Sequence, residues 1–376
     1  MYFFQSIPPE LYHTIYILLV CTLCYITSIF YSFSLTDKCL YYKSPLNLII
    51  SCVLSLFLIL FLGPRPVHKV FVDTGYYVFG YDNIIKSYDS FSLSSEWLWN
   101  NFEFFCKEIG LTSQDFLLVV EFFYIIIPLI TCIKLFHYNS WTPLLFFLSS
   151  FSFYSYGVNG IRNGMACHII LLAIVMISGK PWEKIVSYLL MFIAYGIHRS
   201  TAVPILCLLA STYFIRSTKI AIAIWLSSIF ISLVSGNFLG DLFNQLDLFE
   251  DKSNYFLETS ESGTDASFSS TGFRFDFLLY SLFPILLVGY LTIKRNFKDT
   301  LYNIIANTYI LANAFWIMVI RVSFSNRFAY LSWFLYPLVI AYPLLRMKIW
   351  NCQDRWLACI LFLYAGFKMF MSFVYY

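Results

Sequence analysis

Long apolar segments alternate with short polar ones along the whole chain. Most of these segments are close to the length of about 20 residues that a helix needs to cross a bilayer. None shows the alternating pattern of the roughly ten-residue strands in a transmembrane barrel. The sequence therefore predicts an all-α, polytopic integral membrane protein, with about twelve transmembrane helices in a single transmembrane domain over residues 1–376. The predicted spans are 11–33, 46–62, 115–135, 141–157, 161–178, 184–198, 200–215, 219–237, 275–293, 299–320, 328–345 and 356–374.

Composition agrees with this assignment, and charge gives an orientation. The chain is 60% hydrophobic and only 12% charged, which excludes an ordinary soluble domain. Alternate short loops collect Lys and Arg, so the positive-inside rule makes them cytoplasmic and places both termini outside. No Lys or Arg precedes the first long apolar run, so we expect no cleavable signal peptide. The basic residues of these loops are Lys38, Lys43, Lys134, Lys180, Lys184, Arg216, Lys219, Lys294, Arg295, Lys298, Arg346, Lys348 and Arg355.

Two long loops then fall on the outer, periplasmic side. The first, 63–114, contains the stretches 70–81 and 96–109, which are too polar to span but apolar enough to form interfacial helices. The second, 238–274, is acidic and contains the Ser/Gly-rich stretch 260–272. It is a candidate lid over an outer cleft, the alternative being a solvated acidic loop.

Arginine is distributed differently from lysine in this topology, because several arginines fall at or near the outer face. Their placement there opposes the positive-inside bias, which indicates that these arginines have a function at the outer face. A guanidinium fork suits phosphate and carboxylate groups, so the pattern predicts an anionic, phosphate-bearing substrate handled outside. The alternative is that each arginine contacts lipid head groups. The residues are Arg65, Arg162, Arg199, Arg274, Arg321 and Arg327.

Two short stretches carry the clearest candidate chemistry. In 157–164 (GVNGIRNG) the glycines allow an irregular turn, after which Arg162 lies in the first turn of a helix whose N-terminus favours anions. In 198–204 (HRSTAVP) His198 lies at the membrane boundary as a base or a hydrogen-bond donor, unless it is structural. Ser200 or Thr201 is expected to cap the helix that follows.

Other candidates come from the outer loops and their edges. Asp73 and Tyr77 share a helical face, so Asp73 is a candidate base, and Tyr76 and Tyr77 are candidates for stacking on a sugar. A solvated surface Asp is the competing interpretation. Glu121 lies within the third span and should be protonated or paired with an arginine that the sequence does not identify.

The sequence contains no motif for metal or nucleotide binding. The five histidines are dispersed, no Asp-x-Asp pair lies in an outer loop, and there is no Walker motif or Gly-rich nucleotide loop. We therefore expect no metal, no cofactor and no nucleic-acid partner.

Four places along the chain form a recognisable pattern: Arg65 with Asp73 to Tyr77, Arg162 to Ala166, His198 to Ser200, and Arg327 with Tyr330. This pattern resembles the EpsG-like group of bacterial polysaccharide polymerases, which includes many O-antigen polymerases (Wzy). Asn163 departs from the Gln that is usual in this group, and Thr201 departs from the common Ala.

That resemblance implies a metal-independent glycosyltransferase in the bacterial inner membrane, acting in lipopolysaccharide or other polysaccharide biosynthesis. It would join oligosaccharide repeat units carried on undecaprenyl diphosphate. The expected partners are membrane lipids and, as a candidate, a chain-length regulator. The main alternative is a lipid-linked oligosaccharide flippase, and a membrane acyltransferase comes third. The predicted catalytic residues are Asp73, His198, Arg162, Arg199 and Arg327, and the predicted substrate-binding residues are Arg65, Tyr76, Tyr77, Arg274 and Arg321.

Overall fold

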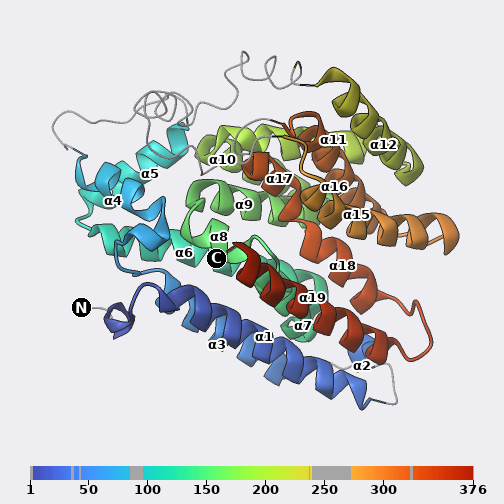
Figure 1. Ribbon diagram of the computed structural model, residues 1–376, viewed down its shortest axis with the longest axis horizontal. Helices are drawn as coiled ribbons and strands as arrows, with labels where there is room; N and C mark the ends of the chain where they lie inside the picture. The colour runs from blue at the N-terminus through green and yellow to red at the C-terminus, as the bar shows by residue number, and fades with distance from the viewer. Residues whose placement is uncertain are drawn as a thin grey trace. The chain divides into compact units, whose positions relative to one another are not determined.

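The computed structural model (Figure 1) describes residues 3–34, 38–41, 44–84, 96–236, 238, 272–321 and 325–375. Among these residues the regular structure is entirely helical, as predicted. The sequence predicted one transmembrane domain, and the chain packs as two compact units. Unit 1 comprises Met1–His198 and Ile340–Tyr376, and unit 2 comprises Arg199–Val339.

Unit 1 contains most of the predicted site. Nearly every side chain of α9 is buried, because α9 packs against α6, α8 and α10. From Ile169 to its end its sequence is apolar all round, which is typical of a helix enclosed by others. The elements are a 3-10 helix at Phe3–Ser6, α1 (Leu11–Ser32), α2 (Lys38–Tyr41), α3 (Pro45–Leu62), a 3-10 helix at Lys69–Phe71, α4 (Thr74–Asp82), α5 (Trp97–Glu108), α6 (Ser113–Phe136), a 3-10 helix at His137–Asn139, α7 (Trp141–Leu148), α8 (Phe153–Val158), α9 (Ile161–Ile177), α10 (Pro181–Ile197) and α19 (Gln353–Tyr375).

Unit 2 is arranged around α16, which packs against α11, α12, α15 and α17. The boundary between the two units falls within α18, at Val339. The elements are a 3-10 helix at Arg199–Thr201, α11 (Ala202–Tyr213), α12 (Thr218–Ser235), α15 (Phe275–Gly289), a π-helix at Tyr290–Lys294, α16 (Thr300–Met318), α17 (Ser325–Trp333) and α18 (Tyr336–Arg346).

The helices support a multi-pass membrane protein. Each of the twelve predicted segments is wholly or largely helical, although 141–157 is broken into α7 and α8. Ser149 lies at this break and donates its hydroxyl to the carbonyl of Leu145 at 2.6 Å, a bond that bends or ends helices. The number of crossings stays a prediction. Among the described residues, seven helical stretches are long and apolar enough to cross a membrane: Leu11–Ser32, Pro45–Leu62, Ser113–Asn139, Thr218–Ser235, Phe275–Lys294, Ser325–Arg346 and Gln353–Val374.

Loops that the charge pattern assigns to one side meet in unit 1. The backbone N–H of Cys39 donates to Asp354 Oδ1 at 2.8 Å, and Asn139 Nδ2 donates to the carbonyl of Cys39 at 2.7 Å. These three residues come from three loops predicted to be cytoplasmic. Lys134 likewise pairs with Glu183. The predicted alternation of loops is therefore consistent with the packing of this unit, and the side of the membrane stays a prediction.

The two interfacial helices predicted in the first long loop also correspond to helices. α4 and α5 begin within a few residues of the predicted stretches. Their position at a membrane interface stays a prediction. Most of the second long loop, including the candidate lid, lies outside the described residues.

Candidate functional site

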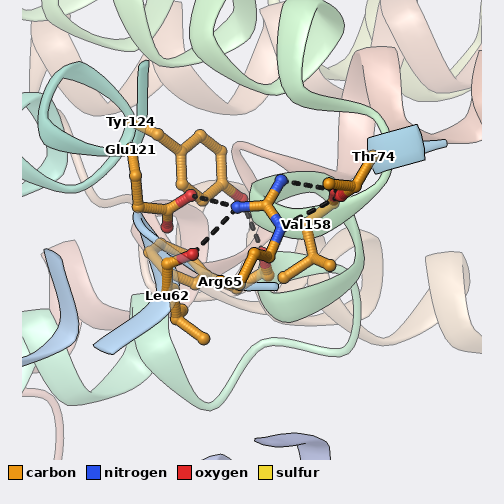
Figure 2. A network of polar contacts seen from close by, with 7 residues as sticks. Leu62, Arg65, Thr74, Glu121, Tyr124 and Val158 are labelled. Atoms are coloured by element: carbon orange, nitrogen blue, oxygen red, sulfur yellow. Dashed lines mark hydrogen bonds and ion pairs between the residues drawn. The ribbon is translucent and has the colours of Figure 1, made fainter. Parts of the chain in front are cut away.

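Arg65 lies in the interior of unit 1, where it is 1% exposed (Figure 2). Its Nη1 donates to the carbonyl of Leu62 at 2.9 Å, and its Nη2 donates to the carbonyl of Val158 at 2.8 Å. Its Nε donates to Thr74 Oγ1 at 3.0 Å. Glu121 Oε2 lies 3.8 Å from Nη1, so Arg65 is the partner of Glu121 that the sequence left open.

This guanidinium joins three parts of the chain. It holds the end of α3 against the start of α4 and the last residue of α8. Such a group, surrounded by protein acceptors, positions its neighbours. Contact of Arg65 with substrate stays a prediction.

The Gly-rich stretch 157–164 forms the predicted break, here between α8 and α9. Its glycines do not supply a left-handed backbone, since Gly157, Gly160 and Gly164 all have negative φ. They supply space instead. A Cβ on Gly164 would lie 2.7 Å from the carbonyl oxygen of Tyr156 and 2.8 Å from the ring of Tyr124. Close packing of these tyrosines therefore sets the position at which α9 begins, and with it the position of Arg162.

Arg162 and His198 meet at one carboxylate. Arg162 lies in the first turn of α9, as predicted, and its Nη1 pairs with Oε2 of Glu96. His198 follows the last residue of α10, and its Nδ1 pairs with Oε1 of the same side chain. The three side chains are only 12–14% exposed. The structure thus brings together two predicted catalytic residues through an acidic residue that the sequence analysis did not assign.

An aromatic wall and a second carboxyl complete this cluster. The guanidinium carbon of Arg162 lies 5.7 Å from the centre of the Tyr77 ring, a cation–π distance. Tyr77 packs edge-on against Trp99, with ring centres 6.0 Å apart. Glu103, in α5, lies close enough to Arg162 and Glu96 for their charges to act on its carboxyl group. Burial raises the pKa of Glu103 to about 7, although the charge of Arg162 opposes the shift.

Glu103 gives a pH-dependent prediction. Its carboxyl ionises near pH 4.5 in the unfolded chain and near 7 in the folded one, so the folded protein loses stability as pH rises between these values. Glu103→Gln should therefore raise the melting temperature at pH 8 and leave it nearly unchanged at pH 4.5. Thermal unfolding of the detergent-solubilised protein at both pH values measures this difference. An equal difference at both would mean that folding does not shift the pKa of Glu103.

Asp73, Tyr76 and Tyr77, the predicted site residues of the first outer loop, differ in how deeply they are buried. Asp73 is half-buried at the start of α4, directly before Thr74. Tyr77 is 7% exposed and belongs to the cluster around Arg162, whereas Tyr76 is 57% exposed. The rings of Tyr76 and Tyr77 meet edge-on, with centres 6.1 Å apart, and Tyr77 lies beside Arg162. Stacking of either ring on a sugar stays a prediction. The role of Asp73 as a base stays a prediction.

Arg199 begins unit 2 in the short 3-10 helix that precedes α11. The predicted capping of α11 by Ser200 or Thr201 is wrong, because the N-cap residue Thr201 makes no side-chain capping bond. Its backbone is already helical (φ −65°, ψ −11°), whereas a capping side chain needs an extended backbone to reach the free N–H groups. The turn that carries Arg199 packs against α17, the helix of Arg327.

The other predicted site arginines of unit 2 lie beside aromatic rings or in the first turn of α17. Arg274 forms two bonds to Asp276, at 3.0 and 2.6 Å, and its guanidinium lies 3.8 Å from the centre of the Phe277 ring. The guanidinium of Arg321 lies 5.6 Å from the centre of the Phe273 ring. Arg327 is half-buried, and residues 322–324, between it and Arg321, lie outside the described residues.

A buried polar network fixes α17. Asn313, on α16, donates to Ser332 on α17 and to Ser281 on α15, both at 3.0 Å. Its carbonyl oxygen accepts the indole N–H of Trp225, on α12, at 2.8 Å. Because every buried polar atom of this amide is used, the network holds α17, and with it Arg327, at a defined position.

The sequence analysis missed Glu96 and Glu103. The sequence analysis treated both only as part of a polar stretch. Electrostatics could have identified them, because Arg162 and His198 at a membrane boundary require a counter-charge, and the first outer loop contains acids.

Among the described residues no group of three His, Cys, Asp or Glu could hold a metal ion.

Comparison with known proteins places the chain in a family. No curated protein and no solved structure matches it. The model of the EpsG family matches residues 48–376, most of the chain, and this span includes every predicted site residue. The family is one of polysaccharide polymerase-like membrane proteins. The chain therefore belongs to the EpsG family.

Proposed function

We propose that this protein is a polysaccharide polymerase that joins oligosaccharide repeat units carried on undecaprenyl diphosphate, for O-antigen or capsule, at the periplasmic face of the inner membrane. The observation that carries the proposal is the pairing of Arg162 and His198 on Glu96, in a member of the EpsG family. This arrangement offers a fixed cation and an imidazole within one largely buried cluster.

The chemistry of the reaction matches these groups. A hydroxyl of the acceptor sugar attacks the anomeric carbon of the growing chain, and the bond from that carbon to the lipid diphosphate breaks. The diphosphate leaves with the electron pair, so its developing negative charge must be neutralised. Fixed guanidinium groups in a site of low dielectric constant do this well, and in our proposal they do so without a metal ion. A basic side chain takes the proton of the hydroxyl, with His198 or Asp73 in that role.

Two lipid-linked substrates require two anion sites. We assign Arg162 to one, and Arg199, Arg321 and Arg327 of unit 2 to the other. The contact between the turn of Arg199 and the helix of Arg327 supports this grouping. Tyr77 then serves the first of these sites, and Arg274 the second. The acidic loop 238–274 acts as a lid, and a chain-length regulator is the expected protein partner.

A deletion strain tests the proposal. Surface polysaccharide from cells lacking this protein is separated on a gel and compared with that of a complemented strain. The proposal predicts a single repeat unit on the lipid core in place of the ladder of long chains. Loss of all repeat units would contradict it and favour a lipid-linked oligosaccharide flippase.

A further inference from the structure

Glu96 makes two directed contacts at once. One carboxylate oxygen pairs with Arg162 on α9, and the other pairs with His198 at the end of α10. The side chain comes from neither of these helices but from the residue that precedes α5. It therefore links three elements of unit 1, and α5 itself packs against α10.

The backbone at Glu96 supports a specific role for its side chain. Its φ of 54° lies in the left-handed region, where residues other than glycine are uncommon. Such a conformation is strained and persists where surrounding contacts hold it. Here the contacts are the two ion pairs of the carboxylate.

The pairing also fixes the imidazole. An ionised carboxylate only accepts hydrogen bonds, so Nδ1 of His198 is the donor to Glu96. In the neutral ring the lone pair is then on Nε2. Both cationic partners, Arg162 and His198, pair with Glu96, whereas burial raises the pKa of Glu103, the next acid along the chain. With a neutral ring, the charges of Glu96 and Arg162 cancel.

We propose that Glu96 is a positioning residue for glycosyl transfer, which holds His198 with Nε2 as the base for the acceptor hydroxyl and holds Arg162 for the leaving diphosphate. This inference rests on the proposed function. In the transfer step the hydroxyl oxygen bonds to the anomeric carbon, the hydroxyl proton moves to Nε2, and the diphosphate takes the electron pair of the broken bond. The cluster thereby gains one positive charge as the leaving group gains one negative charge. Glu96 stays ionised and stabilises the imidazolium, as a carboxylate does for histidine in hydrolase triads.

The test compares Glu96→Gln with wild type in purified protein. The substrate is an undecaprenyl-diphosphate-linked repeat unit, and both kcat and KM are measured. We expect kcat to fall by about 10²-fold or more, the usual contribution of a positioned base. The KM should change little, because the lost contact acts in the transition state. The matched control is Glu108→Gln, an exposed acid on the same helix, which should behave as wild type.

Two further variants separate positioning from a purely structural role. Glu96→Asp keeps the charge that folding requires but moves the carboxylate by one carbon, so its kcat should lie between those of Glu96→Gln and wild type. In a His198→Ala background, Glu96→Gln should cost much less than in wild type, because Glu96 acts through His198. Full additivity of the two losses would overturn the proposal, and so would a wild-type kcat in Glu96→Asp.

The outcomes also separate this inference from the proposed function. Wild-type protein that forms no polymer contradicts the proposed function itself. Active wild type with equally active Glu96→Gln contradicts only the role of Glu96. If Glu96→Gln instead lowers KM and raises the rate, the carboxylate blocks the anion site until substrate displaces it, and the positioning role is overturned.

Discussion

Arg162→Ala should abolish long-chain polysaccharide while the protein stays in the membrane at normal levels. Arg162 lies in the first turn of α9 and shares Glu96 with His198, so its loss removes the fixed cation of the cluster. Removing one electrostatic group of this kind costs about 10²–10³-fold in rate. Long chains need many successive transfers, so a loss of this size per step leaves only short products.

The measurement is a gel of surface polysaccharide, with the protein quantified in membranes through an epitope tag. Arg162→Lys keeps the charge but loses the planar fork, so it should restore only part of the ladder. Arg327→Ala should resemble Arg162→Ala, because both belong to the proposed anion sites. Arg216→Ala is the matched control, since Arg216 is exposed and lies in a loop predicted to be cytoplasmic. A normal ladder from both Arg162→Ala and Arg327→Ala would refute the assignment.

Arg65→Leu should prevent stable folding rather than slow the reaction. It removes three hydrogen bonds and leaves Glu121 buried without its counter-charge. Breaking a buried pair by removing one partner costs about 3–5 kcal/mol. That is a large part of the roughly 5–15 kcal/mol that stabilises a typical protein, so we expect little folded protein in the membrane.

A partial rescue identifies the cause of this loss. Glu121→Gln alone should be milder than Arg65→Leu, because Arg65 keeps its three acceptors. The double variant Arg65→Leu with Glu121→Gln should be more stable than Arg65→Leu alone, since no buried carboxyl group is then left without its counter-charge. Thermal unfolding and membrane yield measure both effects. A stable Arg65→Leu protein with normal yield but no polymer would instead support a substrate contact for Arg65.

Helices and the grouping of loops could be predicted from sequence because both depend on local patterns. Apolar runs set the helices, and the charge pattern grouped loops that include Cys39, Asn139 and Asp354, which meet in unit 1. The break within 141–157 depends on serine side chains that bond to the backbone, as Ser149 does. An apolar run alone carries no sign of such a break.

Roles inside the site were harder to predict because they depend on contacts between residues distant in sequence. Arg65 and Arg162 look alike as outer arginines, yet one is 1% exposed and bonded to protein acceptors, and the other pairs with Glu96. Glu96 precedes a short helix in a polar stretch, a setting in which most acids are solvated. The glycines of 157–164 predicted an irregular turn. In the structure Gly157 and Gly164 leave room for the ring of Tyr124, and Gly160 leaves room for that of Tyr156.

Purified protein in lipid vesicles gives the most direct test of the central claim, with an undecaprenyl-diphosphate-linked repeat unit as the sole substrate. The account predicts a ladder of polymer, with one lipid diphosphate released for each linkage formed, and the loss of both products in Arg162→Ala. Movement of the intact lipid-linked unit across the bilayer with no polymer and no released diphosphate would contradict it.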